Sequence, residues 1–180
     1  MTADGPRPGD EASATPPIAL IGPMAAGKTS IGRKLASRLG RTFADTDRLV
    51  VLEHGPVPQI FAEHGEAVFR RWEAQAVQHA LTPGTVVALG GGAVLDEGTR
   101  ALLREQATVV LVTVDEAGAE RRIAAGGRPL VADGIEAWRR IAAERDPLYR
   151  ELADTTVDTS RTPMARLVDE LEAWLGERGL

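Results

Sequence analysis

The sequence predicts an α/β domain of three layers, in which helices cover both faces of a five-stranded, mostly parallel sheet. Short apolar runs rich in Val, Leu, Ile and Ala alternate with longer segments of helical period. Clusters of Gly and Asp directly follow three of these runs, and such positions meet at one edge of a parallel sheet. The chain of 180 residues has room for one such domain, which we place at residues 18–176.

Five apolar runs are the expected strands. They lie at residues 18–21, 42–44, 85–89, 108–114 and 155–157. The run at 108–114 is the strongest candidate because its residues are β-branched almost throughout. The run at 155–157 is the weakest, since only Val157 is apolar.

Helical periodicity fills the segments between the expected strands. Ile31, Leu35 and Leu39 share one stripe of a helix that Gly40 closes. Further helices are expected at about 48–54, 58–64, 66–81, 97–104, 117–125 and 135–152. The last helix is expected to carry Pro163 in its first turn, where a missing N–H costs nothing.

The two ends of the chain are expected to lie outside the domain. Residues 1–17 are rich in Pro, Gly, Ala and Thr and contain no apolar run, which is typical of a disordered tail. Residues 177–180 are expected to form a short C-terminal tail.

Composition excludes several function classes. The net charge of -5 argues against a nucleic-acid binder, which needs a dense basic face. The chain has no cysteine, so neither disulfides nor thiolate chemistry is available. No stretch approaches the roughly 20 apolar residues of a membrane span, and the acidic N-terminus is unlike a signal peptide. These features predict a cytoplasmic protein that binds neither nucleic acid nor membrane.

Residues 22–29, Gly-Pro-Met-Ala-Ala-Gly-Lys-Thr, match the phosphate-binding pattern G-x-x-x-x-G-K-[ST]. An expected strand precedes them and an expected helix follows, so an ordinary strand–turn–helix is the less favoured interpretation. Backbone N–H groups of such a loop point at phosphate oxygens, Lys28 supplies a charge, and Thr29 offers a hydroxyl to Mg²⁺. The motif therefore predicts ATP and Mg²⁺ as cofactors. The expected nucleotide contacts are Gly22, Ala25, Ala26, Gly27, Lys28, Thr29 and Ser30.

Asp45 and Asp47 leave the end of the second expected strand. Because the expected strand at 85–89 leads into three glycines and not into a metal-binding Asp, Asp45 is the best-placed carboxylate for the metal, together with Thr29. Asp47 suits the group that orients an acceptor hydroxyl and takes its proton during phosphoryl transfer. An N-cap for the helix from Arg48 is the alternative for this pair. The phosphate loop alone does not name the acceptor, because many ATPases and kinases share it.

The set of motifs, in its order along the chain, resembles the shikimate kinase family over about residues 18–174. The motifs are the phosphate loop, Asp45-Thr46-Asp47, Phe69-Arg70-Arg71, Leu89-Gly90-Gly91-Gly92-Ala93, Arg128-Pro129-Leu130 and Arg145-Asp146-Pro147-Leu148-Tyr149. The resemblance implies a monomeric P-loop enzyme that phosphorylates shikimate to shikimate 3-phosphate by direct in-line transfer from ATP. The segment between Gly126 and Ile135 is short for the lid of that family.

The resemblance also implies residue roles. Shikimate would be bound by Asp47, Arg70, Gly90, Gly91, Gly92 and Arg145. The two arginines would face its carboxylate and Asp47 its hydroxyls, while Asp45 would hold Mg²⁺ through water. Arg128 would lie on a small mobile lid at about 124–135 and act with Lys28 and Asp47 in catalysis. Arg122 and Arg161 would lie near the adenine.

Several other interpretations stay open at this point. A gluconate or other sugar-acid kinase would also combine a phosphate loop with arginines. A nucleoside monophosphate kinase is less favoured, because no large second nucleotide-binding insertion is present. A non-catalytic nucleotide-binding regulatory protein would have little use for Asp47. Arg70 with Glu73, and Arg145 with Asp146, also fit simple surface ion pairs, and residues 90–92 fit an ordinary loop.

Overall fold

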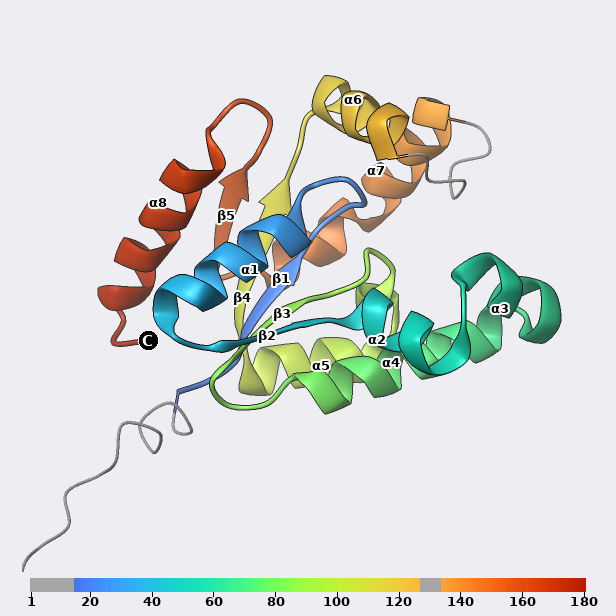
Figure 1. Ribbon diagram of the computed structural model, residues 1–180, viewed down its shortest axis with the longest axis horizontal. Coiled ribbons are helices and arrows are strands. Elements are labelled where there is room, and N and C mark those ends of the chain that lie inside the picture. The colour runs from blue at the N-terminus through green and yellow to red at the C-terminus, as the bar shows by residue number, and fades with distance from the viewer. Residues whose placement is uncertain (1–14, 127–133) are drawn as a thin grey trace, which may run out of the picture.

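The structure is a computed structural model, and it describes residues 15–126 and 134–180. Its five strands form one sheet in the order β2-β3-β1-β4-β5, and every neighbouring pair is parallel (Figure 1). The strands are β1 (Ile18–Ile21), β2 (Thr42–Asp45), β3 (Thr85–Ala88), β4 (Thr108–Thr113) and β5 (Thr155–Asp158). The predicted strands are confirmed, and the sheet is parallel throughout.

The predicted helices are also confirmed, with ends that shift by one or two residues. They are α1 (Lys28–Leu39), α2 (Thr46–His54), α3 (Val57–His64), α4 (Glu66–Ala80), α5 (Glu97–Gln106), α6 (Glu116–Gly126), α7 (Gly134–Leu152) and α8 (Met164–Gly176). Pro163 caps α8 instead of lying in its first turn. A short 3₁₀ helix, η1 (Ala93–Leu95), was not predicted.

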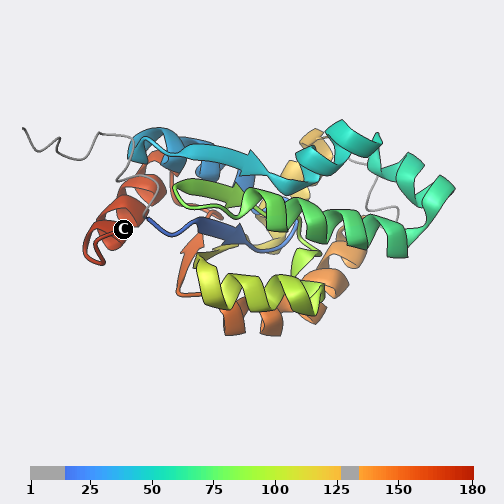
Figure 2. The same ribbon diagram turned by 90° about the horizontal axis from the view of Figure 1, so that it is seen from below.

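Alternation along the strands gives the sheet two apolar faces. Ile18 and Leu20 of β1 point to the face that α1 and α8 cover, whereas Ala19 and Ile21 pack with residues of α4, α5 and α7. Figure 2 shows α5 beside α7 on the side of the sheet away from α1. The three-layer architecture is therefore confirmed.

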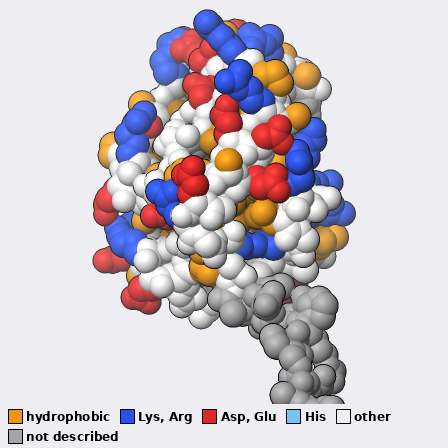
Figure 3. Space-filling view, turned by 90° about the vertical axis from the view of Figure 1, so that its left-hand side faces the viewer, with side chains coloured by type: hydrophobic (Ala, Val, Ile, Leu, Met, Phe, Trp, Pro, Cys, Tyr) orange, Lys and Arg blue, Asp and Glu red, His pale blue; other side chains and the backbone are white. Residues whose placement is uncertain are grey.

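Acidic and basic side chains are interspersed on the face that Figure 3 presents. Arg38 of α1 and Asp169 of α8 form an exposed ion pair. Within the described residues, no helix is both long enough and apolar enough to cross a bilayer.

The expected N-terminal tail ends earlier than predicted. The carbonyl oxygen of Thr15 accepts a hydrogen bond from Gly84 N (2.8 Å), and that of Pro17 accepts one from Thr108 N (2.9 Å). Residues 15–17 thus bridge the segments before β3 and β4, and the prediction of disorder was wrong for them. Residues 1–14 lie outside the described part of the chain, as do residues 127–133 of the expected lid. At the other end, Leu180 packs against the core beside α8.

Helices α2, α3 and α4 form an extension with a small core of its own (Figure 1). Val50, Ile60 and Phe69 make that core, Trp72 packs against it, and the rings of His54 and Trp72 stack on each other with centroids 3.7 Å apart. Because α2 follows β2 directly and α4 leads into β3, this extension carries its side chains to the carboxyl edge of the sheet.

Candidate active site

The phosphate loop connects β1 to α1 at the centre of the sheet. Gly22 has φ of 134°, and a Cβ there would lie 2.1 Å from Val112 O, so only glycine fits. Gly27, with φ of 95°, caps α1. Lys28 Nζ donates hydrogen bonds to Gly22 O (2.7 Å) and Pro23 O (2.8 Å). These bonds hold the lysine ammonium against the backbone of the loop, where its charge would add to an anion cradle.

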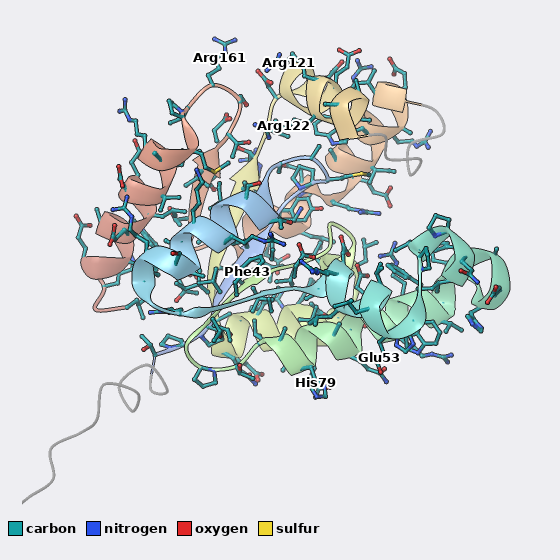
Figure 4. The ribbon with its side chains drawn as sticks, in the orientation of Figure 1. Phe43, Glu53, His79, Arg121, Arg122 and Arg161 are labelled. Atoms are coloured by element: carbon teal, nitrogen blue, oxygen red, sulfur yellow. The ribbon has the colours of Figure 1, made fainter. Side chains whose placement is uncertain are left out.

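Two distant side chains hold the second half of this loop. Arg122 of α6 donates through Nη1 to Ala25 O (2.8 Å), and the hydroxyl of Thr159 donates to Ala26 O (2.8 Å). Arg122 also donates through Nη2 to Thr159 O (2.7 Å), which links α6 to the loop after β5. Arg122 therefore lies against the phosphate loop, on the side of α6 opposite the solvent. Arg161 is exposed on the β5–α8 loop and points outward (Figure 4).

Thr29 and Asp45 come together as the sequence predicted. Thr29 Oγ1 donates to Asp45 Oδ2 at 2.7 Å. Asp45 Oδ1 accepts from Arg48 N at 3.1 Å and so caps α2. The metal and cap interpretations of Asp45 are thus compatible, because they use different oxygens. Helix α2 already begins at Thr46, so Asp47 lies in a first helical turn and not on an extended strand end.

Asp47, Arg70 and Gly90–Gly92 meet at the end of β3. A Cβ added at Gly90 would lie 2.4 Å from Asp47 Oδ1, and one added at Gly92 would lie 2.1 Å from Arg70 Nη1. A side chain at either position would displace the end of one of these side chains from the glycine segment. A Cβ at Gly91 would lie 3.4 Å from Met24 N, so the glycine segment borders the phosphate loop.

Comparison with known proteins decides between the possible families of phosphate-loop enzymes. A family model described as shikimate kinase matches residues 24–175. A shikimate kinase of Stenotrophomonas maltophilia (strain K279a) is 48% identical over 149 residues, which are 80% of this chain and 83% of that protein. The chain belongs to the shikimate kinase family. It is therefore an ATP-dependent kinase, as the motifs predicted.

Solved structures agree with this family. The shikimate kinase from Acinetobacter baumannii in complex with shikimate is 32% identical, with a TM-score of 0.86 over 96% of this chain and 99% of that one. A gluconokinase from Sinorhizobium meliloti 1021 covers 90% of this chain and 93% of its own at 22% identity and a TM-score of 0.63. The gluconokinase shares the fold alone.

Glu73 is a residue of this shikimate kinase family site that sequence reasoning missed. It pairs with Arg70, with Glu73 Oε2 2.7 Å from Arg70 Nη1, but its own side chain is only 4% exposed. A Cβ at Gly90 would lie 2.6 Å from Glu73 Oε1, so this carboxylate borders the same glycine as Asp47. The pair is therefore not the surface ion pair that the i,i+3 spacing suggested. Burial raises the pKa of the Glu73 carboxyl, and the neighbouring Arg70 opposes that rise.

Arg145 joins this cluster from α7. The positive charge of Arg145 acts to lower the pKa of Glu73. Arg145 also lies beside Tyr149, and burial raises the pKa of Tyr149 to about 12. Among the described residues, Arg145 Nε is a buried side-chain nitrogen without a hydrogen-bond partner. Its neighbour Asp146 is paired with Arg150 instead (2.6 Å), so the surface pair with Arg145 is wrong. A buried donor of this kind, clustered with Glu73 and Tyr149, is typical of a group that a ligand completes.

Proposed function

We propose that this chain transfers the γ-phosphoryl group of MgATP to the 3-hydroxyl of shikimate, giving ADP and shikimate 3-phosphate. One observation carries the proposal. Asp47 and Arg70 lie against a glycine segment that borders the phosphate loop, and Arg145 acts on Glu73 of the same cluster. The complex of the Acinetobacter baumannii relative with shikimate supports the same acceptor. All of these groups come from one chain, which fits a monomeric enzyme.

The acceptor side combines cations for a carboxylate with a carboxylate for hydroxyls. Arg70 and Arg145 would bind the shikimate carboxylate, because guanidinium groups match a carboxylate with paired hydrogen bonds. Glu73 would hold the Arg70 guanidinium in place by accepting its hydrogen bond. Asp47 would accept a hydrogen bond from the reacting hydroxyl and receive its proton as the new oxygen–phosphorus bond forms and the bond to ADP breaks.

The nucleotide side would use the phosphate loop from Gly22 to Ser30. Thr29 and Asp45 are a hydroxyl and a carboxylate 2.7 Å apart. No group of three His, Cys, Asp or Glu side chains suited to a metal occurs among the described residues. One carboxylate and one hydroxyl fit Mg²⁺, which keeps several waters and bridges phosphate oxygens. When bound, Mg²⁺ neutralises charge that develops on the transferred phosphoryl group.

Arg122, Arg128 and Arg161 complete the proposed nucleotide site. Arg122 would act on the nucleotide through the phosphate loop, which it holds by a hydrogen bond to Ala25 O. Arg161 lies on the neighbouring β5–α8 loop. Arg128 lies outside the described residues, and its action on the transferred phosphoryl remains part of the proposal. An arginine that closes over the phosphates would also exclude water that hydrolyses ATP.

A coupled ADP-release assay over shikimate, quinate, gluconate and a few nucleotides tests the function. We expect shikimate-dependent release, with the product identified by mass as a monophosphate. Release with gluconate but not shikimate would replace the assignment with the sugar-acid kinase. ATP binding without release for any acceptor would favour the regulatory protein.

Replacing Asp45 by Asn tests the metal site. The change keeps an oxygen for the α2 cap but removes the charge near Thr29. We expect the Mg²⁺ concentration for half-maximal activity to rise about 10-fold or more, as for other residues that support a metal from its second coordination shell. Asp169→Asn, on exposed α8, is the matched control and should leave the Mg²⁺ dependence unchanged. An unaltered Mg²⁺ requirement in Asp45→Asn would remove Asp45 from the metal site.

Replacing Gly92 by Ala tests the acceptor loop. The backbone of Gly92 has φ of -92°, which alanine adopts, but the new Cβ would lie 2.1 Å from Arg70 Nη1. The guanidinium must move, so we expect KM for shikimate to rise about 10-fold while KM for ATP stays nearly constant, given the strength of one charge-assisted bond. Gly176→Ala, where a Cβ meets nothing within 4 Å, is the control. A change in KM for ATP alone would contradict the placement.

A further inference from the structure

Two side chains of α7 donate hydrogen bonds to the two loops that build the active site. Trp138 Nε1 donates to Met24 O of the phosphate loop at 2.9 Å. Tyr149 Oη donates to Gly91 O of the glycine segment at 2.6 Å. Both residues are buried, with exposures of 7% and 2%. They are separated by about three helical turns and so lie on the same side of α7.

Helix α7 spans the distance between the two halves of the site. Arg145, the proposed carboxylate ligand, lies about two turns after Trp138 on this side of the helix. The two loops also border each other, because a Cβ at Gly91 would lie 3.4 Å from Met24 N and 3.6 Å from Gly22 O. One helix therefore contacts the phosphate loop and the acceptor loop and carries an arginine proposed to bind the substrate.

Packing also joins α7 to the site, since Trp138 and Met24 share an apolar cluster, but non-directional packing does not fix where a loop carbonyl points. A cavity of about 440 Å³ lies between α7 and the end of β4, lined in part by Pro23, Trp138 and Tyr149. On that side Pro23 of the loop lacks the dense contacts of a protein interior. The two hydrogen bonds are then the specific links from α7 to the loop backbones. A buried indole or phenol needs a polar partner, and here both partners are active-site carbonyls.

We propose that Trp138 and Tyr149 are positioning residues, through which α7 fixes the phosphate loop and the acceptor loop at the separation that in-line transfer requires. The inference rests on the proposed function. Loss of either bond frees a carbonyl, and the peptide plane that carries it can turn. Displacements of this size lower the rate of the chemical step more than they weaken binding, because reacting atoms must lie within a narrow range of distance.

Trp138→Phe and Tyr149→Phe, singly and together, test the proposal. Each removes one donor and keeps an aromatic ring. We expect kcat to fall about 10-fold in each single variant, while KM for ATP and for shikimate stay within about threefold, because ground-state contacts are kept. The double variant should lose less than the product of the two single losses, since both bonds act through one helix. Trp174→Phe on α8, where the indole contacts Arg178, controls for loss of an indole.

Thermal unfolding of the same variants distinguishes positioning from simple stabilisation. A lowered Tm with unchanged kcat would make both residues structural and overturn the proposal. A rise in either KM without loss of kcat, or an effect of the double variant equal to the product, would also overturn it. Should Trp138→Phe fail to fold, Tyr149→Phe, which lacks a single oxygen atom, decides by the same kcat criterion. If the unmodified chain does not phosphorylate shikimate, the proposed function is wrong independently of this proposal. The kcat ratios of the variants are then measured with the acceptor that the ADP-release assay identifies.

Discussion

Replacing Lys28 by Ala is expected to lower kcat by roughly 10³-fold, the upper range for loss of one group that stabilises transition-state charge. In the structure, Lys28 Nζ lies 2.7 Å from Gly22 O and 2.8 Å from Pro23 O, at the centre of the phosphate loop. A bound ATP would place its β- and γ-phosphates beside this ammonium group. In the Lys28→Ala protein, no cation of the loop would stabilise the charge that spreads over the phosphoryl oxygens during transfer.

The chain offers a matched control for this change, because Lys28 and Lys34 are its two lysines. Both lie on α1, but Lys34 is exposed and faces away from the loop. Lys34→Ala should leave kcat and both KM values unchanged. Circular dichroism and thermal unfolding would establish that Lys28→Ala is folded. Undiminished turnover by a folded Lys28→Ala protein would refute the phosphate-loop assignment.

Replacing Arg145 by Ala is expected to raise KM for shikimate about 10- to 150-fold, the equivalent of one charge-assisted hydrogen bond of about 1.5–3 kcal/mol. Arg145 Nε is buried without a partner among the described residues, so its hydrogen-bonding capacity is available for the substrate carboxylate. KM for ATP should change little, because Arg145 clusters with Glu73 and Tyr149 on the acceptor side.

Arg150→Ala is the control for loss of an arginine from α7. Arg150 is exposed and pairs with Asp146 at 2.6 Å, an arrangement worth about 0–1 kcal/mol at a surface. Steady-state kinetics with each substrate varied in turn measures both variants. Equal losses for shikimate and ATP in Arg145→Ala would assign the residue a structural or nucleotide-side role.

The fold followed from local patterns. Short continuous apolar runs predicted the five strands and period-3.6 spacing predicted the principal helices, since each pattern reflects how an element is buried. Element ends were less certain. Asp45 caps α2 so that the helix begins at Thr46, and the sequence alone did not separate that cap from a metal ligand. The sequence predicts that residues 15–17 belong to the tail. Their order in the structure comes from hydrogen bonds with Gly84 and Thr108, which lie far along the chain.

Sequence motifs predicted part of the candidate site. The phosphate loop, Asp45 and Thr29 came together because parallel strands end at one edge of the sheet. Glu73 appeared only in the alternative of a surface ion pair with Arg70, since i,i+3 spacing is the same whether a pair is exposed or buried. Tyr149 ends one of the family motifs, but the hydrogen bonds of Trp138 and Tyr149 were not predictable, because nothing in an apolar helix face indicates which backbone carbonyl a buried donor reaches.

The sequence by itself determined the α/β class, the anion-binding turn and the family, because these depend on residue types at fixed local spacing. Only the tertiary structure decided that the strands run β2-β3-β1-β4-β5, that Glu73 is buried, and that α7 contacts both loops. These features depend on which distant segments pack together. Burial and hydrogen bonding across such contacts are properties of the folded chain as a whole, and no local window of residues contains them.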